Sequence, residues 1–253
     1  MKASERVEVE ALRSLFDVPE PRGVLRQAGG AIAIRVDGLP IKELNRIVGL
    51  YDLDDLAELQ EVFDERPYWI TLDPEAGLDD ELLGRGYVHA GAWQKFERGV
   101  EPYDAATDLE VIDARSRADV ATYLRRAWGV PPQEAEWLSG VHDLSSWHCF
   151  VAYDGAEAVG GGMLYVLDDA GWIGVAATQP EYRGRGVQSA VFAARFERAR
   201  KLGLRQLVTE TGITEPPGPS YRNMLRAGFE PVYARPVYTA SGADSSSSSG
   251  SRP

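Results

Sequence analysis

The sequence predicts an α+β fold built on a mixed sheet that is flanked by helices. Strand-like alternation and helix-like spacing of apolar residues follow one another along the chain, and Gly-rich or Asp-rich turns separate them. Of the 253 residues, 44% are hydrophobic, which is enough to bury the core of one large domain or two modest ones.

From residue 108 onward the expected elements follow in a clear order. This order is strand, two helices, three strands, helix, strand, short helix and strand. A plausible N-cap (Ser116), a pair of prolines (Pro131 and Pro132) and a stop glycine (Gly203) mark three helix boundaries. The expected ranges are 109–112, 118–128, 131–138, 147–153, 158–166, 172–178, 186–202, 204–210, 220–228 and 229–238.

The first hundred residues show a fainter version of the same pattern, with a helix at 53–63 and strands at 68–72 and 93–96. The segment 82–87 resembles 224–229, because in each a Gly ends a helix and an aromatic begins a strand. This is either a degenerate internal repeat or a chance recurrence. A break in pattern at 99–107 predicts an N-terminal α/β domain at 1–107 and a second domain at 108–240. The Ser-rich segment 241–253 is expected to be disordered.

Bulk charge and composition limit the partners. The formal charge is −12, which disfavours nucleic acid and membrane surfaces and favours a basic acceptor such as an amine, although acidity also simply maintains solubility. A single cysteine, Cys149, excludes an internal disulfide and a Cys-based zinc site. His89, His142 and His148 stand far apart, so no metal is expected. With no apolar leader or spanning segment, we expect a cytoplasmic protein.

A loop rich in glycine and arginine stands between a strand and a long helix. Its residues are Arg183, Gly184, Arg185, Gly186, Val187 and Gln188. Amides at a helix start lack partners within the helix, the helix dipole favours anions, and glycines let a ligand approach the backbone. The pattern indicates a pyrophosphate site, or else an ordinary turn. It is neither a P-loop nor a dinucleotide G-x-G-x-x-G fingerprint.

The segment 180–187 resembles the acetyl-CoA loop Q/R-x-x-G-x-G/A of the GNAT superfamily of N-acetyltransferases. Gly203, the strand 204–210 and the segment 226–229 match that family in order and spacing, so the resemblance spans 108 to about 240. It implies a GNAT-like sheet and acetyl-CoA as the acyl donor. The implied coenzyme contacts are Ala176, Ala177, Thr178, Arg183, Gly184, Arg185, Gly186, Val187, Gln188, Ser189 and Asn223, with an amide near Val175 or Ala176 polarising the thioester carbonyl. Gln188 departs from the small residue of the family pattern.

The acid and base of such a reaction are less clear. Glu210 is the candidate general base because its strand end faces the coenzyme cleft in this family, but it is equally a solvated strand end. Many family members have a Tyr proton donor where this chain has Met224. Tyr221 lies one helical turn earlier and is the candidate substitute, or a surface residue. Ser220 is expected to cap its helix. Three glycines at 160–162 predict either a flat wall for the acceptor or acyl group, or a β-bulge.

These observations predict an N-acetyltransferase that moves an acetyl group from acetyl-CoA to a primary amine of a small molecule or protein. Two alternatives remain. One is a non-catalytic acyl-CoA-binding or interaction module, and the other is a transferase that uses a longer acyl-CoA. The sequence specifies neither the acceptor nor the oligomeric state.

Overall fold

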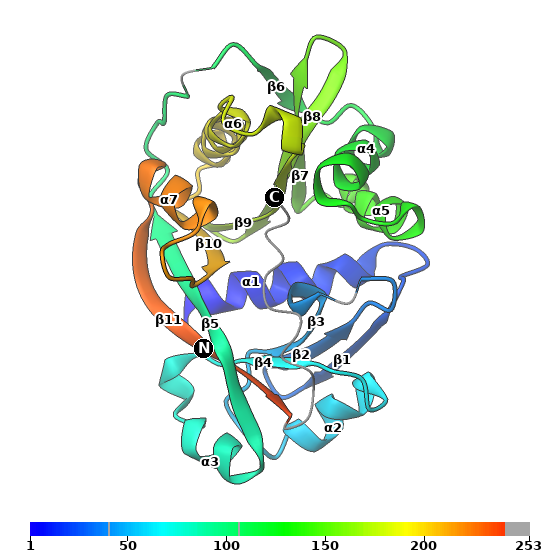
Figure 1. The fold of residues 1–253 in the computed structure, drawn as a ribbon, viewed down its shortest axis with the longest axis vertical. Helices are drawn as coiled ribbons and strands as arrows, with labels where there is room; N and C mark the ends of the chain where they lie inside the picture. Colours follow the sequence, from blue (N-terminus) through cyan, green and yellow to red (C-terminus); the bar gives the residue numbers. More distant parts are fainter. Residues whose placement is uncertain (40, 106, 241–253) are drawn as a thin grey trace.

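The computed structural model describes residues 1–39, 41–105 and 107–240. Within them the strands form one mixed sheet of 11 strands in the order β1-β2-β3-β4-β11-β5-β10-β9-β8-β7-β6. Helices cover the sheet, as Figure 1 shows. The predicted α+β class is therefore confirmed. The Ser-rich segment 241–253, predicted to be disordered, lies outside the described residues.

The strands have bounds that the sequence predicts well after residue 108 and poorly before it. They are β1 Val24–Ala28, β2 Ala31–Arg35, β3 Asn45–Val48, β4 Trp69–Thr71, β5 Tyr87–Arg98, β6 Glu110–Asp113, β7 Trp147–Asp154, β8 Glu157–Leu167, β9 Ala170–Thr178, β10 Gln206–Gly212 and β11 Glu230–Ala240. The α-helices are α1 Ala3–Ser14, α2 Leu56–Gln60, α3 Asp79–Gly84, α4 Arg117–Trp128, α5 Pro132–Ser139, α6 Val187–Lys201 and α7 Pro219–Arg226.

Helix boundaries follow the local signals with one exception. Ser116 caps α4 by accepting a hydrogen bond from the Asp119 amide, and Gly129 ends this helix in the left-handed region at φ +71°. Ser220 is not a cap as predicted. Gly218 is the N-cap of α7 and Pro219 its first residue, because the proline ring suits a first helical position that needs no amide hydrogen. Ser220 therefore lies inside the helix.

The two halves of the sheet exchange their long strands. β5 belongs to the first half of the chain but lies between β10 and β11, and β11 lies between β4 and β5. Both run antiparallel to their neighbours. On the two sides of this pair, β3 is parallel to β4 and β9 is parallel to β10. The topology of the first half thus repeats that of the second around the β5–β11 pair (Figure 1).

The two segments that resemble each other in sequence occupy equivalent places in this topology. Residues 82–87 end α3 and begin β5, and residues 224–229 end α7 and lead to β11. The division at residue 107 stays a prediction. One sheet crosses it, and so does the apolar core that α1 builds, in which Val7 and Leu12 share a cluster with Ile32 of β2 and Trp172 of β9. The sequence analysis missed α1 and β1 to β3.

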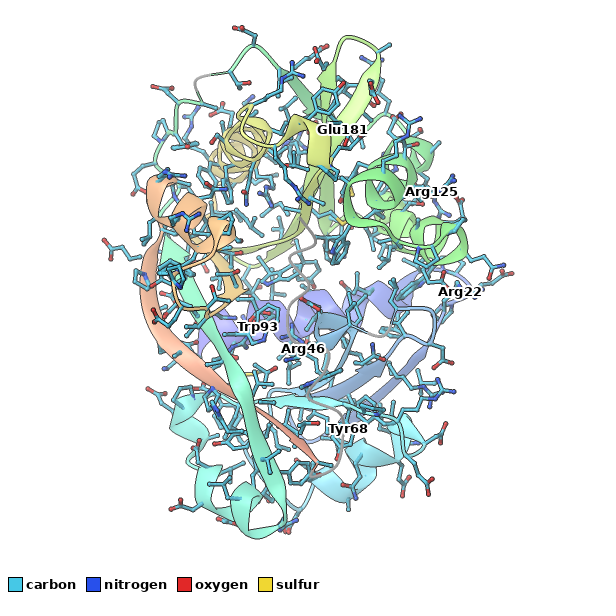
Figure 2. All side chains as sticks on the ribbon, in the orientation of Figure 1. Arg22, Arg46, Tyr68, Trp93, Arg125 and Glu181 are labelled. Atoms are coloured by element: carbon cyan, nitrogen blue, oxygen red, sulfur yellow. The ribbon has the colours of Figure 1, made fainter. Side chains whose placement is uncertain are left out.

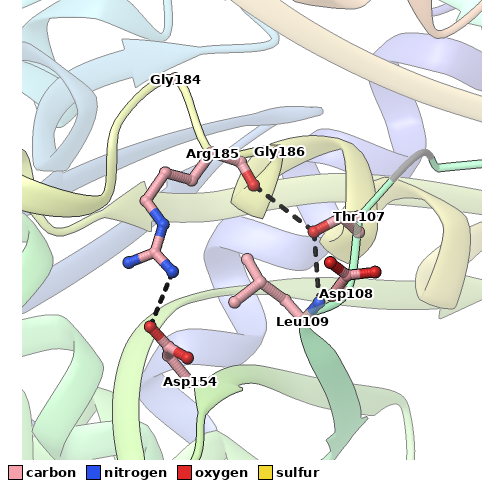
Figure 3. A pocket seen from close by; sticks show the side chains of 7 residues that line it. All are labelled: Thr107, Asp108, Leu109, Asp154, Gly184, Arg185 and Gly186. Carbon is pink, nitrogen blue, oxygen red and sulfur yellow. Dashed lines mark hydrogen bonds and ion pairs between the residues drawn. The ribbon is translucent and has the colours of Figure 1, made fainter.

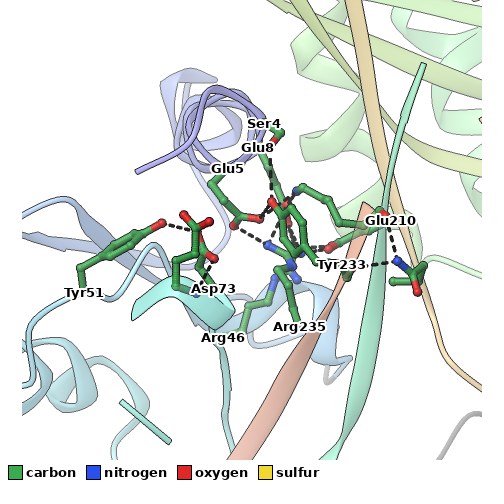
Figure 4. Close-up of polar contacts among 12 residues, drawn as sticks. Ser4, Glu5, Glu8, Arg46, Tyr51, Asp73, Glu210, Tyr233 and Arg235 are labelled. Atoms are coloured by element: carbon green, nitrogen blue, oxygen red, sulfur yellow. Dashed lines mark hydrogen bonds and ion pairs between the residues drawn. The ribbon is translucent and has the colours of Figure 1, made fainter. Parts of the chain in front are cut away.

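A buried cluster of charges joins both halves beneath α1 (Figure 4). Glu8 of α1 bonds Arg46 of β3 at 2.8 Å and Arg235 of β11 at 3.0 Å, and it also pairs with Lys95 of β5. Glu5 pairs with Arg235 at 2.8 Å. Burial alone would raise the pKa of Glu8, but attraction to Arg235, Lys95 and Arg46 outweighs burial and lowers it below its ordinary 4.5.

The lowered pKa of Glu8 predicts acid lability. A carboxyl group whose folded pKa is depressed stabilises the fold above its unfolded pKa, here about 4.5, and this contribution is lost as pH falls further. We expect the melting temperature to fall steeply below that pH. Glu8→Gln should cost about 3–5 kcal/mol at pH 7 and flatten the acid limb. Glu197→Gln, which removes an exposed ion pair, is the matched control. Identical melting of wild type at pH 7 and pH 3.5 would contradict this role.

Candidate active site

A cleft opens where two parallel strands of the sheet separate. β9 and β10 pair only from Ala170 to Trp172 and from Gln206 to Val208. At the next position the Thr209 hydroxyl donates to the Ile173 carbonyl at 2.8 Å. Beyond it lies a cavity of about 1030 Å³, lined on both sides of the sheet by residues of α1, α6, α7, β5 and β10 among others. Such a gap between strands can accept an extended ligand along the freed edge of β9.

A strained bulge in β9 forms one wall of this cleft. The β8–β9 register shifts between Gly161 and Met163, so β9 contains one additional residue, and Val175 has φ +49°. A β-branched residue in this region is strained by about 1–3 kcal/mol. The buried Tyr123 hydroxyl donates to the Val175 carbonyl at 2.9 Å, which holds the bulge in place. The bulge turns the backbone at Val175 and Ala176 toward the cleft that both residues line.

The amides at the start of α6 are the second part of the site. Gly184 and Gly186 have φ of +79° and +83°, and the helix begins directly after Gly186. The Arg183 and Arg185 amides donate to the carbonyls of Pro180 and Tyr182 at 3.2 and 3.4 Å. Within the described residues, the remaining amides of the loop and first turn have no protein acceptor: those of Gly184, Gly186, Val187, Gln188 and Ser189. Unpaired amides at the start of a helix are a suitable place for an anion to bind.

The two arginines of the loop behave differently. Arg183 is exposed, and among the described residues it makes no ion pair, so its guanidinium is free to meet an anion. Arg185 pairs with Asp154 at 2.8 Å and lies 4.8 Å from the Tyr182 ring. Figure 3 shows this pair beside a cavity of about 450 Å³ that Gly184 and Gly186 also line. Arg185 thus fixes the loop rather than offering a free charge.

Gln188 does not crowd the helix start. Its side-chain carbonyl accepts a hydrogen bond from the side-chain amide group of Asn223 in α7, so Gln188 bridges α6 and α7 at the cleft. Arg226 in turn donates to the Asn223 side-chain oxygen at 2.9 Å. The structure thus brings two sequence-predicted coenzyme contacts together. Ala176 also lines the cleft, while Ala177 and Thr178 pair with β8 through Gly161 and Gly160.

The β-bulge interpretation of the glycines at 160–162 is confirmed, since the register with β7 shifts beside Gly160 and the register with β9 shifts between Gly161 and Met163; the glycines also serve packing. A Cβ at Gly160 would meet Val187 of α6, and one at Gly162 would meet Arg195 of α6. A Cβ at Gly161 would meet the Tyr123 ring of α4. The run therefore lets α6 approach one face of β8 and lets Tyr123 approach the other. One irregularity lies in β8, between Ala158 and Gly160, and the other lies opposite the run, in β9.

Glu210 lines the cleft but is not a free carboxylate. One oxygen bonds Arg46 at 3.0 Å, and the other pairs with Arg235. Glu43, which the sequence analysis missed, also lines the cleft and makes no ion pair or hydrogen bond within the described residues. No pattern in the sequence identifies Glu43 as a cleft residue, because it lies in a single turn between β2 and β3. Figure 2 shows Arg46 beside Trp93, with the guanidinium 5.6 Å from the ring.

Tyr221 does not reach the cleft wall. Its ring packs edge-on against Phe96 of β5 at 5.0 Å between centroids. Ser220 and Met224 from the same helix line the cleft instead. Of the two residues of α7 that carry a hydroxyl, Ser220 therefore lines the cleft, whereas Tyr221 packs against Phe96.

The equivalent connection in the first half has a different chemical character. The connection from β3 to α2 is equivalent to the one from β9 to α6, but it contains Asp52, Asp54 and Asp55 where the second half has arginine and glycine. The Asp52 carboxylate already accepts the Asp54 amide at 2.9 Å. Three carboxylates would repel a phosphate, so this connection is not a counterpart of the start of α6.

Separated parallel strands, a β-bulge and unpaired amides at the next helix meet at this cleft. Residues 112–229 match the model of the acetyltransferase (GNAT) family. This part of the chain is a GNAT-family acetyltransferase domain. No curated protein matches the chain significantly.

Solved structures share the fold over nearly the whole chain. A GCN5-related N-acetyltransferase from Kribbella flavida is similar at a TM-score of 0.63 and 16% identity, covering 96% of this chain and 97% of that one. One from Sphaerobacter thermophilus gives 0.60 and 17%, covering 91% and 84%. A tandem GNAT protein from the clavulanic acid biosynthesis pathway, solved without AcCoA, gives 0.63 and 14%, covering 92% and 87%. The tandem neighbour agrees with the repeated topology.

Two further features concern the described residues alone. No helix among them combines the length and apolar character needed to cross a membrane. No group of three or more His, Cys, Asp or Glu side chains among them is arranged to hold a metal ion.

The helix start predicts the effect of a side chain at Gly186. Gly186→Val adds a branched side chain where the phosphates would approach and should weaken coenzyme A binding at least about tenfold, or about 1.4 kcal/mol. Gly203→Val is the matched control, because Gly203 has a similar φ of +77° at the far end of α6. Calorimetry measures both. Equal affinity for coenzyme A in the two variants would show that the helix start does not bind it.

Proposed function

We infer that this protein transfers an acetyl group from acetyl-CoA to a primary amine of a small molecule or protein. The observation that supports this most is the row of unpaired amides at the start of α6, beside the strands that separate. A pyrophosphate would accept from the amides of Gly184, Gly186 and Val187, with Arg183 adding charge. The pantetheine arm would extend along the edge of β9 that β10 has left free.

The bulge would then act on the thioester. The carbonyl oxygen of the thioester would lie near the backbone amide of Val175 or Ala176. This amide would stabilise the negative charge that develops on the oxygen as the amine attacks. The C–N bond forms, the C–S bond breaks, and coenzyme A leaves as the thiolate. Strain at Val175 and its bond to Tyr123 keep the amide in place before the reaction begins. The proton that the nitrogen releases as the amide forms would reach the thiolate through Ser220 in the cleft wall, whose hydroxyl gives its proton to the sulfur and takes up that of the nitrogen.

The amine must lose a proton, and two carboxylates in the cleft wall compete for this role. Glu210 is the candidate from sequence, but ion pairs with Arg46 and Arg235 occupy both of its oxygens. Glu43 is unpaired and lies on the side of the cleft formed by the first half. We therefore propose Glu43 as the base, and Glu210 as the residue that positions Arg46.

Paired substitutions separate these roles. Glu43→Gln should lower kcat by about 10²–10⁴-fold and remove the acid limb of the pH–rate profile, with little change in melting temperature, because general-base catalysis is lost but no ion pair is broken. Glu210→Gln should lower the melting temperature and keep the acid limb. If instead Glu210→Gln removed the acid limb and Glu43→Gln kept it, Glu210 would be the base.

A binding module without catalysis is the second candidate. It is favoured by Met224, which occupies the position of the usual Tyr donor, and by the packing of Tyr221 against Phe96. Under that alternative the protein would bind acyl-CoA without turnover.

Thiol release distinguishes the two candidates. When the protein is mixed with acetyl-CoA and a panel of amines, we expect free thiol to appear only with both substrates present. The Gly186→Val variant should release little at the same acetyl-CoA concentration. Tight coenzyme A binding without thiol release from any acyl donor would contradict the enzymatic proposal and support the module.

A further inference from the structure

A buried arginine in the coenzyme cleft has no anionic partner. Arg195 of α6 is fully buried. Its Nε donates to the Val191 carbonyl at 3.2 Å and its Nη1 to the Met163 carbonyl at 3.3 Å. The guanidinium also lies 4.9 Å from the Phe192 ring. These contacts hold the side chain in one place.

The charge of Arg195 is uncompensated. Among the described residues no carboxylate lies within ion-pair distance, and Nη2 has no hydrogen-bond partner. By contrast, the buried Arg46, Lys95 and Arg235 all pair with glutamates. Burial lowers the pKa of Arg195 to about 9, so it stays protonated at pH 7. A lone buried cation is costly unless something neutralises it, which suggests that a ligand supplies the anion.

The position of Arg195 narrows the choice of ligand. It lines the cleft together with Gln188 and Phe192, which lie on the same stripe of α6. Met163, which accepts its hydrogen bond, is the cross-strand partner of Gly174, next to the bulge. The coenzyme phosphates would bind about 12 Å away along the axis, at about 1.5 Å per residue from the helix start. Since Met163 places Arg195 beside the bulge, where the thioester carbonyl would bind, we assign the group beside Arg195 to the acyl end of the donor.

The side of the sheet on which Arg195 lies indicates that its ligand is the donor and not the acceptor. Gly162 faces Arg195, whereas the adjacent Gly161 faces Tyr123 of α4 on the other side. Residues from α1 and the turn before β3 line the part of the cleft beyond the sheet, where an acceptor would enter. Arg195 thus lies on the α6 side, with the coenzyme.

Resting on the proposed acyl transfer from a coenzyme A thioester to an amine, but replacing acetyl as the preferred acyl group, we propose that Arg195 selects a donor whose short acyl chain ends in a carboxylate, such as a malonyl or succinyl group. The distal carboxylate accepts from Nη2 and neutralises the guanidinium. It takes no part in the transfer, in which the amine forms the C–N bond, the C–S bond breaks and coenzyme A leaves. Arg195 is then a specificity-determining residue.

The test compares donors of equal carbon number. In wild type, succinyl-CoA should bind more tightly than butyryl-CoA by about 10- to 100-fold, as expected for a charge-assisted hydrogen bond. Arg195→Met should remove this preference and leave the affinity for unacylated coenzyme A unchanged. Arg195→Lys should retain part of the preference, because it keeps the charge without the planar fork. Arg198→Met is the control on the same helix, since Arg198 pairs with Asp113 at the surface.

The possible results separate a failure of the proposed donor selectivity from a failure of the proposed function. Equal affinity for succinyl- and butyryl-CoA in wild type overturns the proposal, even if Arg195→Met fails to fold. A loss of kcat with every donor, at unchanged affinities, also overturns it and assigns Arg195 to the transition-state oxyanion. If coenzyme A itself fails to bind wild type, the proposed function fails rather than the donor selectivity.

Discussion

The site depends on the early separation of two parallel strands. β9 and β10 share three residue pairs, after which the Thr209 hydroxyl takes the place of a backbone donor to Ile173. The bulge at Val175 bends β9 further, and Tyr123 fixes it from the opposite face. Without this gap the sheet would be closed, the amides of α6 would face no groove, and Arg195 would be buried with no route for a ligand.

The two halves are unequal partners in one molecule. The exchange of β5 and β11 makes each half complete the sheet of the other, and the charge cluster under α1 connects five elements from both. The connection after β3 carries aspartates where the connection before α6 carries arginine and glycine. What the first half supplies instead is the far wall of the cleft, including Glu43 and Arg46. We therefore regard it as the part that shapes the acceptor site.

Local signals could be read from the sequence, whereas long-range placement could not. The elements after residue 108 begin and end within two residues of the predictions, because caps, turns and periodicity are local. The helix start at Gly186 was equally visible. Strand alternation does not identify a strand's neighbour, so the β5–β11 exchange was not foreseen. For the same reason the arginines around Glu210 and the isolation of Arg195 appear only in three dimensions.

The most direct test follows the amides themselves. The hydrogen-exchange rate or the NMR chemical shift of each backbone amide at the start of α6 can be recorded with and without coenzyme A. We expect coenzyme A to cause strong protection or large shifts at the amides of Gly184, Gly186, Val187, Gln188 and Ser189, and none at the equivalent connection 49–55 of the first half. If the exchange rates and chemical shifts of the amides at the α6 start stayed the same with saturating coenzyme A, the claim that these amides bind the coenzyme would be contradicted.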